Sequence, residues 1–313
     1  MKTMCEGNQT QVTAFVLLGF RSLPNLKLLL FTLFLLVYVA LLAGNLLIVV
    51  LVTINDHLKN IPMFYFLKHL SSADVLLTTS IVPLMLSIII MDGMVVSVVG
   101  CIIQFSFFGV SGFVQGYLLA VMSLDRYLAI RCPLRYTVIM SPRLCFQLVS
   151  GCWFIVFTIT SSEVAIIGQL EFCDQNDIDH FFCDLLPLAE LATSDTSMLL
   201  SMDFSVAVIG LCIPFNFIIS TYLLIFFMIT RIRSVSGRRK FFSTCSSHLT
   251  SVCTYYVTLT IVYMAPSGEN SATENKFRSL LYIVGIPLVN PIIYSLRNQE
   301  IKAALNKVLH YLC

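Results

Sequence analysis

Long apolar stretches, separated by short polar segments, divide the chain. A helix that crosses a bilayer needs about 20 mostly apolar residues, and seven stretches meet this condition. They cover residues 27–54, 62–91, 97–130, 143–168, 197–229, 240–264 and 277–295. The earlier apolar patch at 12–20 is too short to cross and lacks the basic start of a secretory signal peptide. The pattern predicts an all-α membrane protein, a seven-helix bundle whose first helix is the uncleaved insertion signal.

Composition supports this class. The chain is 58% hydrophobic and only 12% charged, with a mean hydropathy of +0.88, whereas soluble domains carry about 25% charged residues. The connecting segments leave no room for a second globular domain. We therefore expect one membrane domain over 1–313, with an N-terminal segment at 1–26, the bundle at 27–295 and a C-terminal segment at 296–313.

The placement of lysine and arginine predicts the orientation. No Lys or Arg lies between Arg143 and Arg231, and the loop at 165–196 is acidic. Short basic loops stay in the cytoplasm, so this acidic loop is expected outside, with the basic segments 131–143 and 231–240 inside. Counting the spans then places the N-terminus on the extracellular side of the plasma membrane. Asn8 begins a glycosylation sequon on that same side.

A proline break interrupts the last span. Pro291 cannot donate a backbone hydrogen bond and crowds the carbonyl group four residues earlier, and in lipid the freed group must find another donor. Asn290 lies beside it. We expect a hinge at this point, with the Asn290 amide bound to the loosened backbone.

Ionisable residues inside a bilayer are costly, and so they are functional candidates. Asp74, Glu163 and Asp203 lie within predicted spans, and the pair Asp125 and Arg126 lies at the inner end of the third. The arginine can pair with its neighbouring carboxylate or offer its donors to a partner. The alternative is an arginine that only extends to the membrane interface.

The eleven cysteines contain no Cys-x-x-Cys spacing that would indicate a metal framework. Cys101 opens the third span at its outer end, and Cys173 and Cys183 lie in the acidic outer loop, where disulfides persist. A bridge from Cys101 would hold this loop over the bundle, although spacing leaves either loop cysteine as its partner. A metal site at His180 and Cys183 is the less favoured alternative, because acidic loop residues are usually solvated.

The run at 122–136, Met-Ser-Leu-Asp-Arg-Tyr-Leu-Ala-Ile-Arg-Cys-Pro-Leu-Arg-Tyr, resembles the inner end of the third helix of vertebrate odorant receptors. These are a branch of the rhodopsin-like G-protein-coupled receptors. Similar matches follow in order along the whole chain, at 15–20, 44–45, 62–63, 70–74, 180–184, 194–196, 240–249, 256 and 287–298.

The resemblance implies a receptor that binds a small odorant and activates a stimulatory olfactory G protein to raise cyclic AMP. It implies no cofactor, metal or nucleic acid. Asp125 and Arg126 correspond to its ionic switch, and a disulfide is implied between Cys101 and Cys183. The remaining switch residues are Tyr222, Tyr256, Asn290, Pro291 and Tyr294. The segment 297–309 resembles a short helix along the inner leaflet of the lipid.

Asn45 and Asp74 resemble a polar hub that joins the first two helices to the seventh. Gln115 stands where the family commonly has a glutamate, so this hub carries one negative charge fewer and tight sodium binding is not expected. Thr193 replaces a third outer-loop cysteine. Cys173 is therefore either a free thiol or linked elsewhere.

The resemblance places the ligand among the outer halves of the third, fifth, sixth and seventh helices. Helical spacing then selects the residues Phe108, Gly109, Gly112, Asp203, Val206, Ala207, Gly210, Leu259, Thr260 and Tyr263. Ordinary helix packing is the alternative, although the glycines favour open space. Apolar walls suit a small, mostly hydrophobic ligand that accepts hydrogen bonds from Tyr263 and Thr260. An amine becomes plausible if Asp203 faces the cavity, with Glu163 assisting.

Other functional classes have less support. The chain has no phosphate loop, zinc-protease motif or nucleophile elbow, so an enzyme is not expected. An ion transporter could use the carboxylates within the spans, but the number of spans is odd and no inverted repeat is visible. A non-olfactory chemosensor of the same fold, for an endogenous amine or metabolite, stays open.

Overall fold

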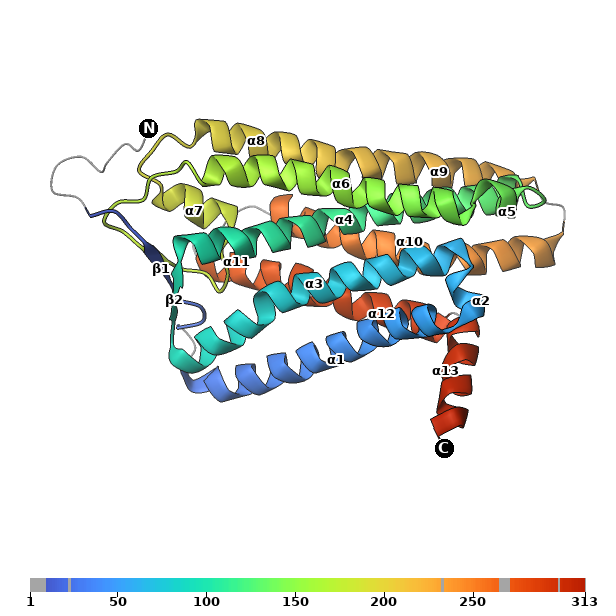
Figure 1. Cartoon of the computed structure of the whole chain (residues 1–313), viewed down its shortest axis with the longest axis horizontal. Helices are drawn as coiled ribbons and strands as arrows, with labels where there is room; N and C mark the ends of the chain where they lie inside the picture. Colours follow the sequence, from blue (N-terminus) through green and yellow to red (C-terminus); the bar gives the residue numbers. More distant parts are fainter. Residues whose placement is uncertain (1–9, 22–23, 232–233, 265–270, 298, 313) are drawn as a thin grey trace.

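The computed structural model describes residues 10–21, 24–231, 234–264, 271–297 and 299–312. These residues form seven long helical segments, which run lengthwise and side by side in one bundle (Figure 1). Four of them are single helices: α1 (Lys27–Ile54), α3 (Pro62–Met91), α4 (Val98–Arg131) and α6 (Pro142–Ile167). Another, α10 (Val235–Met264), is also continuous. The predicted glycosylation residue Asn8 lies outside the described residues.

The fifth and seventh segments each contain a π-helical turn. The fifth consists of α8 (Ser197–Ala207), η2 (Val208–Cys212) and α9 (Ile213–Thr230), and the seventh of α11 (Ser271–Leu280), η3 (Leu281–Gly285) and α12 (Ile286–Arg297). All seven predicted stretches are therefore helical. Six of them are long and apolar enough to cross a membrane. The sixth segment, α10, is less apolar because its first half is rich in charged and hydroxyl side chains.

Helix starts follow the local sequence. Ser97 caps α4 by accepting a hydrogen bond from the Gly100 amide at 3.0 Å, and Ser141 precedes α6 in the same way. Pro62 and Pro142 occupy the first position of α3 and α6, where a missing N–H group costs nothing. The short helices α2 (Asp56–Lys59), α5 (Tyr136–Ile139) and α7 (Leu185–Leu191) lie in the connections.

A small sheet covers one end of the bundle, which we call the outer end (Figure 1). Strand β1 (Ala14–Leu17) lies between β2 (Met94–Ser97), to which it is antiparallel, and β3 (Asp177–Ile178), to which it is parallel. Phe15 and Leu17 are fully buried and alternate with partly exposed residues. The all-α prediction describes the bundle correctly but missed these strands. The patch at 12–20 contains β1 because it pairs with two distant segments.

At the opposite, inner end, α13 (Gln299–Leu312) turns away steeply from the bundle axis (Figure 1). Ile301 and Ala304 are buried against the bundle. The helix begins within two residues of the predicted start at 297. Its apolar residues therefore have a packing role at this end, in addition to the lipid contact that the sequence predicts.

Helix α1 passes close to Pro291 of α12 at Gly44, so a substitution of this glycine should lower stability. A Cβ atom added at Gly44 would lie 3.1 Å from Cβ of Pro291 and 3.2 Å from its Cγ, and a proline ring cannot rotate away. We expect Gly44→Ala to lower the unfolding free energy by about 1–3 kcal/mol, measured by thermal unfolding in detergent. Gly151→Ala in α6 is the control, since nothing lies within 4 Å of its added Cβ. Equal loss in both variants would contradict the prediction.

Candidate functional site

The proline break in α12 is stabilised by another helix. Pro291 leaves the carbonyl group of Pro287 without a backbone donor, and the Asn45 Nδ2 atom of α1 donates to this oxygen at 3.0 Å and to Leu41 O at 3.1 Å. The Asn290 amide instead donates to the Asp74 carboxylate of α3 at 3.0 Å. The expectation that Asn290 binds the loosened backbone is therefore wrong. Asn45 fills that role, and Asn290 joins α12 to α3.

The polar hub around these bonds is buried. Asn45, Asp74, Gln115 and Asn290 are each at most 3% exposed. Among the described residues, neither polar atom of the Gln115 side chain has a hydrogen-bond partner, and the second carboxylate oxygen of Asp74 has none either. Gln115 thus contributes an uncharged amide at this depth. Of the three predicted hub residues, only Asp74 carries an ionisable group.

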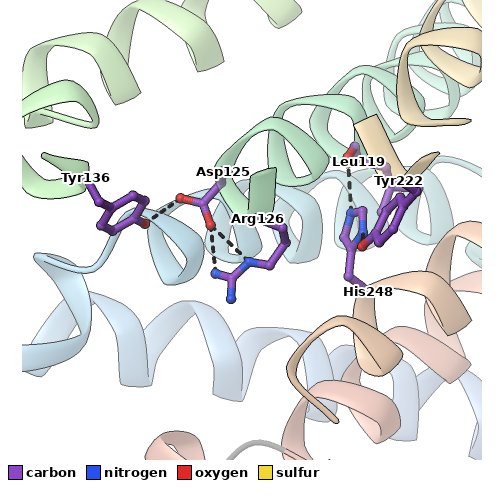
Figure 2. Close-up of polar contacts among 6 residues, drawn as sticks. All are labelled: Leu119, Asp125, Arg126, Tyr136, Tyr222 and His248. Carbon is purple, nitrogen blue, oxygen red and sulfur yellow. Dashed lines mark hydrogen bonds and ion pairs between the residues drawn. The ribbon is translucent and has the colours of Figure 1, made fainter. Parts of the chain in front are cut away.

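At the inner end, Arg126 is held by its neighbour on α4 (Figure 2). The Asp125 carboxylate accepts hydrogen bonds from Nη2 of Arg126 at 2.7 Å and from Nε at 3.1 Å. Its other oxygen accepts from the Tyr136 hydroxyl at 2.6 Å. Burial and the adjacent Asp125 charge raise the pKa of Tyr136, so this hydroxyl keeps its proton and donates. Arg126 is therefore paired with its neighbouring carboxylate, which is one of the two arrangements expected from the sequence.

Tyr136 was not among the predicted switch residues. It closes the motif at 122–136, eleven residues after Asp125, but only the folded loop with α5 shows that its hydroxyl returns to the carboxylate. It lies on the same connection that carries the predicted inner basic residues. The pair Asp125 and Arg126 is thereby coupled to the conformation of the loop between α4 and α6.

A second polar contact joins three helices near Arg126 (Figure 2). The Tyr222 hydroxyl of α9 lies 2.6 Å from Nδ1 of His248 in α10, and the Nε2 atom of this histidine lies 3.1 Å from the Leu119 carbonyl oxygen of α4. A carbonyl group can only accept, so Nε2 carries the proton and Tyr222 donates to Nδ1. His248, which is 1% exposed, was missed because its position in the polar motif 240–249 does not show that it faces the bundle.

The other predicted switch residues are also inside the bundle. The Tyr256 ring packs on Phe215 at 4.6 Å between centroids and on Tyr255 at 5.0 Å. Tyr294 is fully buried. The hydroxyl groups of Tyr256 and Tyr294 have no hydrogen-bond partner among the described residues. Both groups can accept new partners if the helices shift.

A small apolar cavity lies between α4, η2, α10 and η3. The space available to the centre of a water-sized sphere is about 20 Å³, enough for about one water molecule. The lining residues are Phe108, Gly109, Gly112, Phe113, Leu211, Tyr255, Leu259 and Tyr282.

Four of the predicted ligand-binding residues line this cavity: Phe108, Gly109, Gly112 and Leu259. The lining does not include the predicted Asp203, Val206, Ala207, Gly210 and Thr260. Thr260 is exposed, and its hydroxyl donates to the Tyr256 carbonyl of its own helix at 2.8 Å. The side chain of Tyr263 is outside the described part. The cavity lining contains two tyrosine side chains, Tyr255 and Tyr282, neither of which was predicted.

The glycines do not leave open space. A Cβ atom at Gly112 would lie 2.2 Å from the Tyr282 hydroxyl oxygen, and one at Gly210 would lie 2.6 Å from the Phe113 ring. The Tyr255 hydroxyl donates to the Gly112 carbonyl at 3.0 Å. The expectation of free volume at these glycines is wrong, because aromatic side chains of neighbouring helices fill it. The glycines instead allow aromatic rings to approach the backbone, at Gly112 in α4 and at Gly210 in η2.

Two of the missed lining residues lie in π-helical turns. Leu211 belongs to η2 and Tyr282 to η3. A π turn contains an extra residue, so it rotates the residues that follow relative to an ideal α-helix. In η2 the Tyr117 hydroxyl of α4 donates to the Ile209 carbonyl at 2.9 Å. On the fifth segment the lining residue is Leu211, and none of the residues selected there by helical spacing lines the cavity.

The outer loop is attached to the bundle and contacts one residue of the cavity wall. The predicted disulfide between Cys101 and Cys183 is present, and the Gln104 side chain accepts a hydrogen bond from the Cys183 amide at 3.0 Å. Phe182 lies 5.1 Å from Phe108 between ring centroids. Lys276 of α11 pairs with Asp179 at 2.5 Å. The loop is thus attached to α4 and to α11, on both sides of the cavity.

The remaining loop residues have defined states. Cys173 is also disulfide-bonded, so the alternative of a free thiol is wrong. Burial, together with the nearby Lys276 charge, lowers the pKa of His180 to about 3, so this histidine is neutral near pH 7. Within the described ranges, no three His, Cys, Asp or Glu side chains lie close enough together to hold a metal ion.

A bundle of seven long helices, with a bridged loop over an apolar cavity and a paired arginine at the other end, defines a multi-pass membrane receptor. The family model for olfactory receptors matches residues 34–311. Similar proteins include Olfactory receptor 11A1 of Homo sapiens, 43% identical over 99% of this chain and 97% of that protein. Olfactory receptors 5G9 and 5G26 of Mus musculus are 42% and 45% identical, over 98% and 96% of this chain and 97% and 95% of theirs. The chain belongs to the olfactory receptor family.

Membership of this family makes the protein an odorant receptor that signals through a G protein, and not an enzyme.

The bond between Asn45 and Pro287 can be tested directly. Asn45→Ala leaves the Pro287 carbonyl oxygen buried without a donor, so we expect the unfolding free energy to fall by about 1–3 kcal/mol, measured by thermal unfolding in detergent. Asn216→Ala is the matched control. Its amide binds the Cys212 carbonyl of its own helix at an exposed position, and we expect a change below about 0.5 kcal/mol. A stability loss no larger than that of the control would argue against the assigned role.

Proposed function

We propose that the receptor lies in the plasma membrane with its N-terminus outside, and binds a small, mostly apolar odorant in the cavity at its outer end. Binding activates a stimulatory olfactory G protein and raises cyclic AMP. The observation that carries this proposal is an apolar cavity lined by four helical segments, at the opposite end of the bundle from a paired arginine. The acidic outer loop, the basic inner connections and the Asn8 sequon support the orientation.

The cavity suits a ligand that is held mainly by shape. Its walls are aromatic or aliphatic except for the hydroxyl groups of Tyr255 and Tyr282, and apolar lining with few polar groups is typical of small-molecule sites. A volume of about 20 Å³ is too small for an odorant, so binding requires displacement of a lining ring. Tyr282 occupies the space at Gly112. Its movement couples ligand binding to the π turn of the seventh segment.

The sixth segment connects the cavity to the inner end. Leu259 and Tyr255 face the cavity, whereas His248 on the same helix binds Tyr222 and Leu119. Eleven residues separate Leu259 from His248, or about 16 Å along an α-helix. A ligand that packs better against a displaced α10 shifts the equilibrium by that difference in affinity. Outward movement of α10 breaks the His248 bonds and exposes the region beside Arg126 to a G-protein helix.

The ligand site is tested at Gly112. A methyl group there would displace the Tyr282 hydroxyl and occupy space that the ligand needs. We expect Gly112→Ala to raise the half-maximal concentration of an agonist, found by screening small volatiles against cyclic AMP output, by at least about tenfold, or about 1.4 kcal/mol. Gly151→Ala should leave it unchanged, since its added methyl group contacts nothing. Unaltered potency with normal surface expression would exclude this cavity as the ligand site.

The inner switch is tested with two variants that should act in opposite directions. Arg126→Ala should abolish the agonist-dependent rise in cyclic AMP, because the arginine is expected to contact the G protein. Tyr136→Phe removes a hydrogen bond to the Asp125 carboxylate, worth about 1.5–3 kcal/mol, and should raise basal cyclic AMP several-fold at equal surface expression.

Tyr38→Phe is the control for the second variant, because its hydroxyl donates only to Thr79, at 3.3 Å, far along the chain from the switch. Full agonist-driven signalling by Arg126→Ala would overturn the proposed coupling. Basal activity equal in both tyrosine variants would remove the role of Tyr136.

A further inference from the structure

Three carboxylates of the outer end are near enough to influence one another electrostatically, although they are not close enough together to hold a metal ion. Glu163 lies on α6, Asp203 on α8 and Asp184 at the start of α7. The charges of Asp184 and Asp203 are close enough to Glu163 to repel it, and Asp203 also repels Asp184. Burial and the nearby Asp203 charge raise the pKa of Asp184 to about 6, against the hydrogen bond from Leu185. Negative charge is thus concentrated between these elements.

No basic side chain of the described part neutralises this charge. The sequence has no Lys or Arg between Arg143 and Arg231, so α6, α7 and α8 offer none. The described basic residues at the outer end already have acceptors: Arg21 binds the Asp92 carbonyl, Lys27 the Asp92 carboxylate, Lys276 pairs with Asp179, and Arg278 pairs with Glu274. A buried charge without a partner is costly. Among the described residues, no basic side chain is left to remove this cost.

The central carboxylate is buried and unpartnered. Glu163 is 2% exposed, and no described residue forms a hydrogen bond or ion pair with it. Asp203, on the facing helix, is likewise without such a bond within the described ranges. Asp184 differs, because one of its oxygens accepts from the Leu185 amide at 2.9 Å and caps α7. Glu163 and Asp203 are therefore the two carboxylates available to a ligand.

Thr160 links these carboxylates to the cavity. It lies three residues before Glu163, so both face the same side of α6, and both are buried. Thr160 is 1% exposed, and its hydroxyl group has no hydrogen-bond partner among the described residues. A Cβ atom at Gly109, which lines the cavity, would lie 3.1 Å from the Thr160 methyl group and 3.5 Å from its hydroxyl oxygen. Polar acceptors thus continue from the cavity wall to Glu163.

We propose that Glu163, with Asp203 beside it, binds the ammonium group of a small amine whose apolar body occupies the cavity. This inference rests on the proposed function, and it specifies the chemical class of the odorant. An ammonium group has three donors and no acceptor, which matches two carboxylates and the Thr160 hydroxyl. The aromatic lining, including Phe108 and Tyr282, contacts the hydrocarbon part. A metal ion fits less well, since the described residues contain no cluster of three metal-binding side chains.

The experiment compares matched amines and alcohols on the full chain. Cells that express the receptor are exposed to cyclohexylmethylamine, cyclohexylmethanol, 2-phenylethylamine and 2-phenylethanol, and cyclic AMP is measured. In parallel, the purified receptor is heated with each compound, because a ligand that binds only the folded state stabilises it. At least one amine should be about tenfold more potent than its alcohol and should raise the unfolding temperature.

Glu163→Gln keeps the shape of the side chain and removes its charge. It should lower the potency of the active amine by at least about tenfold and leave any response to the matched alcohol unchanged. Asp203→Asn, at a partly exposed position, should act in the same direction if Glu163→Gln is not expressed at the surface. Glu190→Gln is the control, because this glutamate is an exposed residue of α7 outside the carboxylate group.

Any one of three results would overturn the inference. These are activity of the alcohols alone, equal loss of amine and alcohol responses in Glu163→Gln, or no amine-dependent signal in either assay. A response to zinc chloride that is lost in Glu163→Gln, without an amine response, would assign the carboxylates to a metal ion. Amine stabilisation without a cyclic AMP response would instead contradict the proposed signalling and leave the amine site supported.

Discussion

The carbonyl oxygen of Pro287 is the constraint around which the bundle is arranged. Pro291 removes its backbone donor, and lipid offers no replacement. The Asn45 amide supplies the bond at 3.0 Å, and Gly44 lets α1 approach the proline ring closely enough for this bond to form. Asn290 is thereby free to bind Asp74. The hydrogen bonds around this one interrupted backbone therefore join α1, α3 and α12.

The two functional ends depend on polar contacts of the same kind. At the inner end Asp125 holds Arg126 and accepts from Tyr136, while His248 joins α9, α10 and α4. At the outer end the disulfide of Cys183 fixes the loop over the cavity. Because α10 contributes both to the cavity and to the His248 contact, its position couples the two ends. Glu163 differs from these residues, since it is buried and forms no hydrogen bond or ion pair with a described residue.

The sequence predicted contacts between residues that are close together in the chain better than contacts between residues that are far apart in it. Asp125 and Arg126 are adjacent in the chain, and their pairing was correctly considered. Tyr136 and His248 make contacts with residues far along the chain, and no local pattern specifies them. Phe108, Gly109 and Gly112 lie on a regular helix, so their shared face was correct. Leu211 and Tyr282 lie in π turns, which a pattern of regular helices does not reveal.

The sequence by itself determined the seven helices, because burial in lipid requires long apolar segments whose backbone bonds are internal. It also determined the family, through motifs spread along the chain. Tertiary structure decided which side chains meet: Asn45 with Pro287, Tyr222 with His248, and β1 with two distant strands. It also decided that aromatic rings from neighbouring helices fill the space beside the glycines. These outcomes depend on packing between helices, where a rotation by one residue replaces every contact on a face.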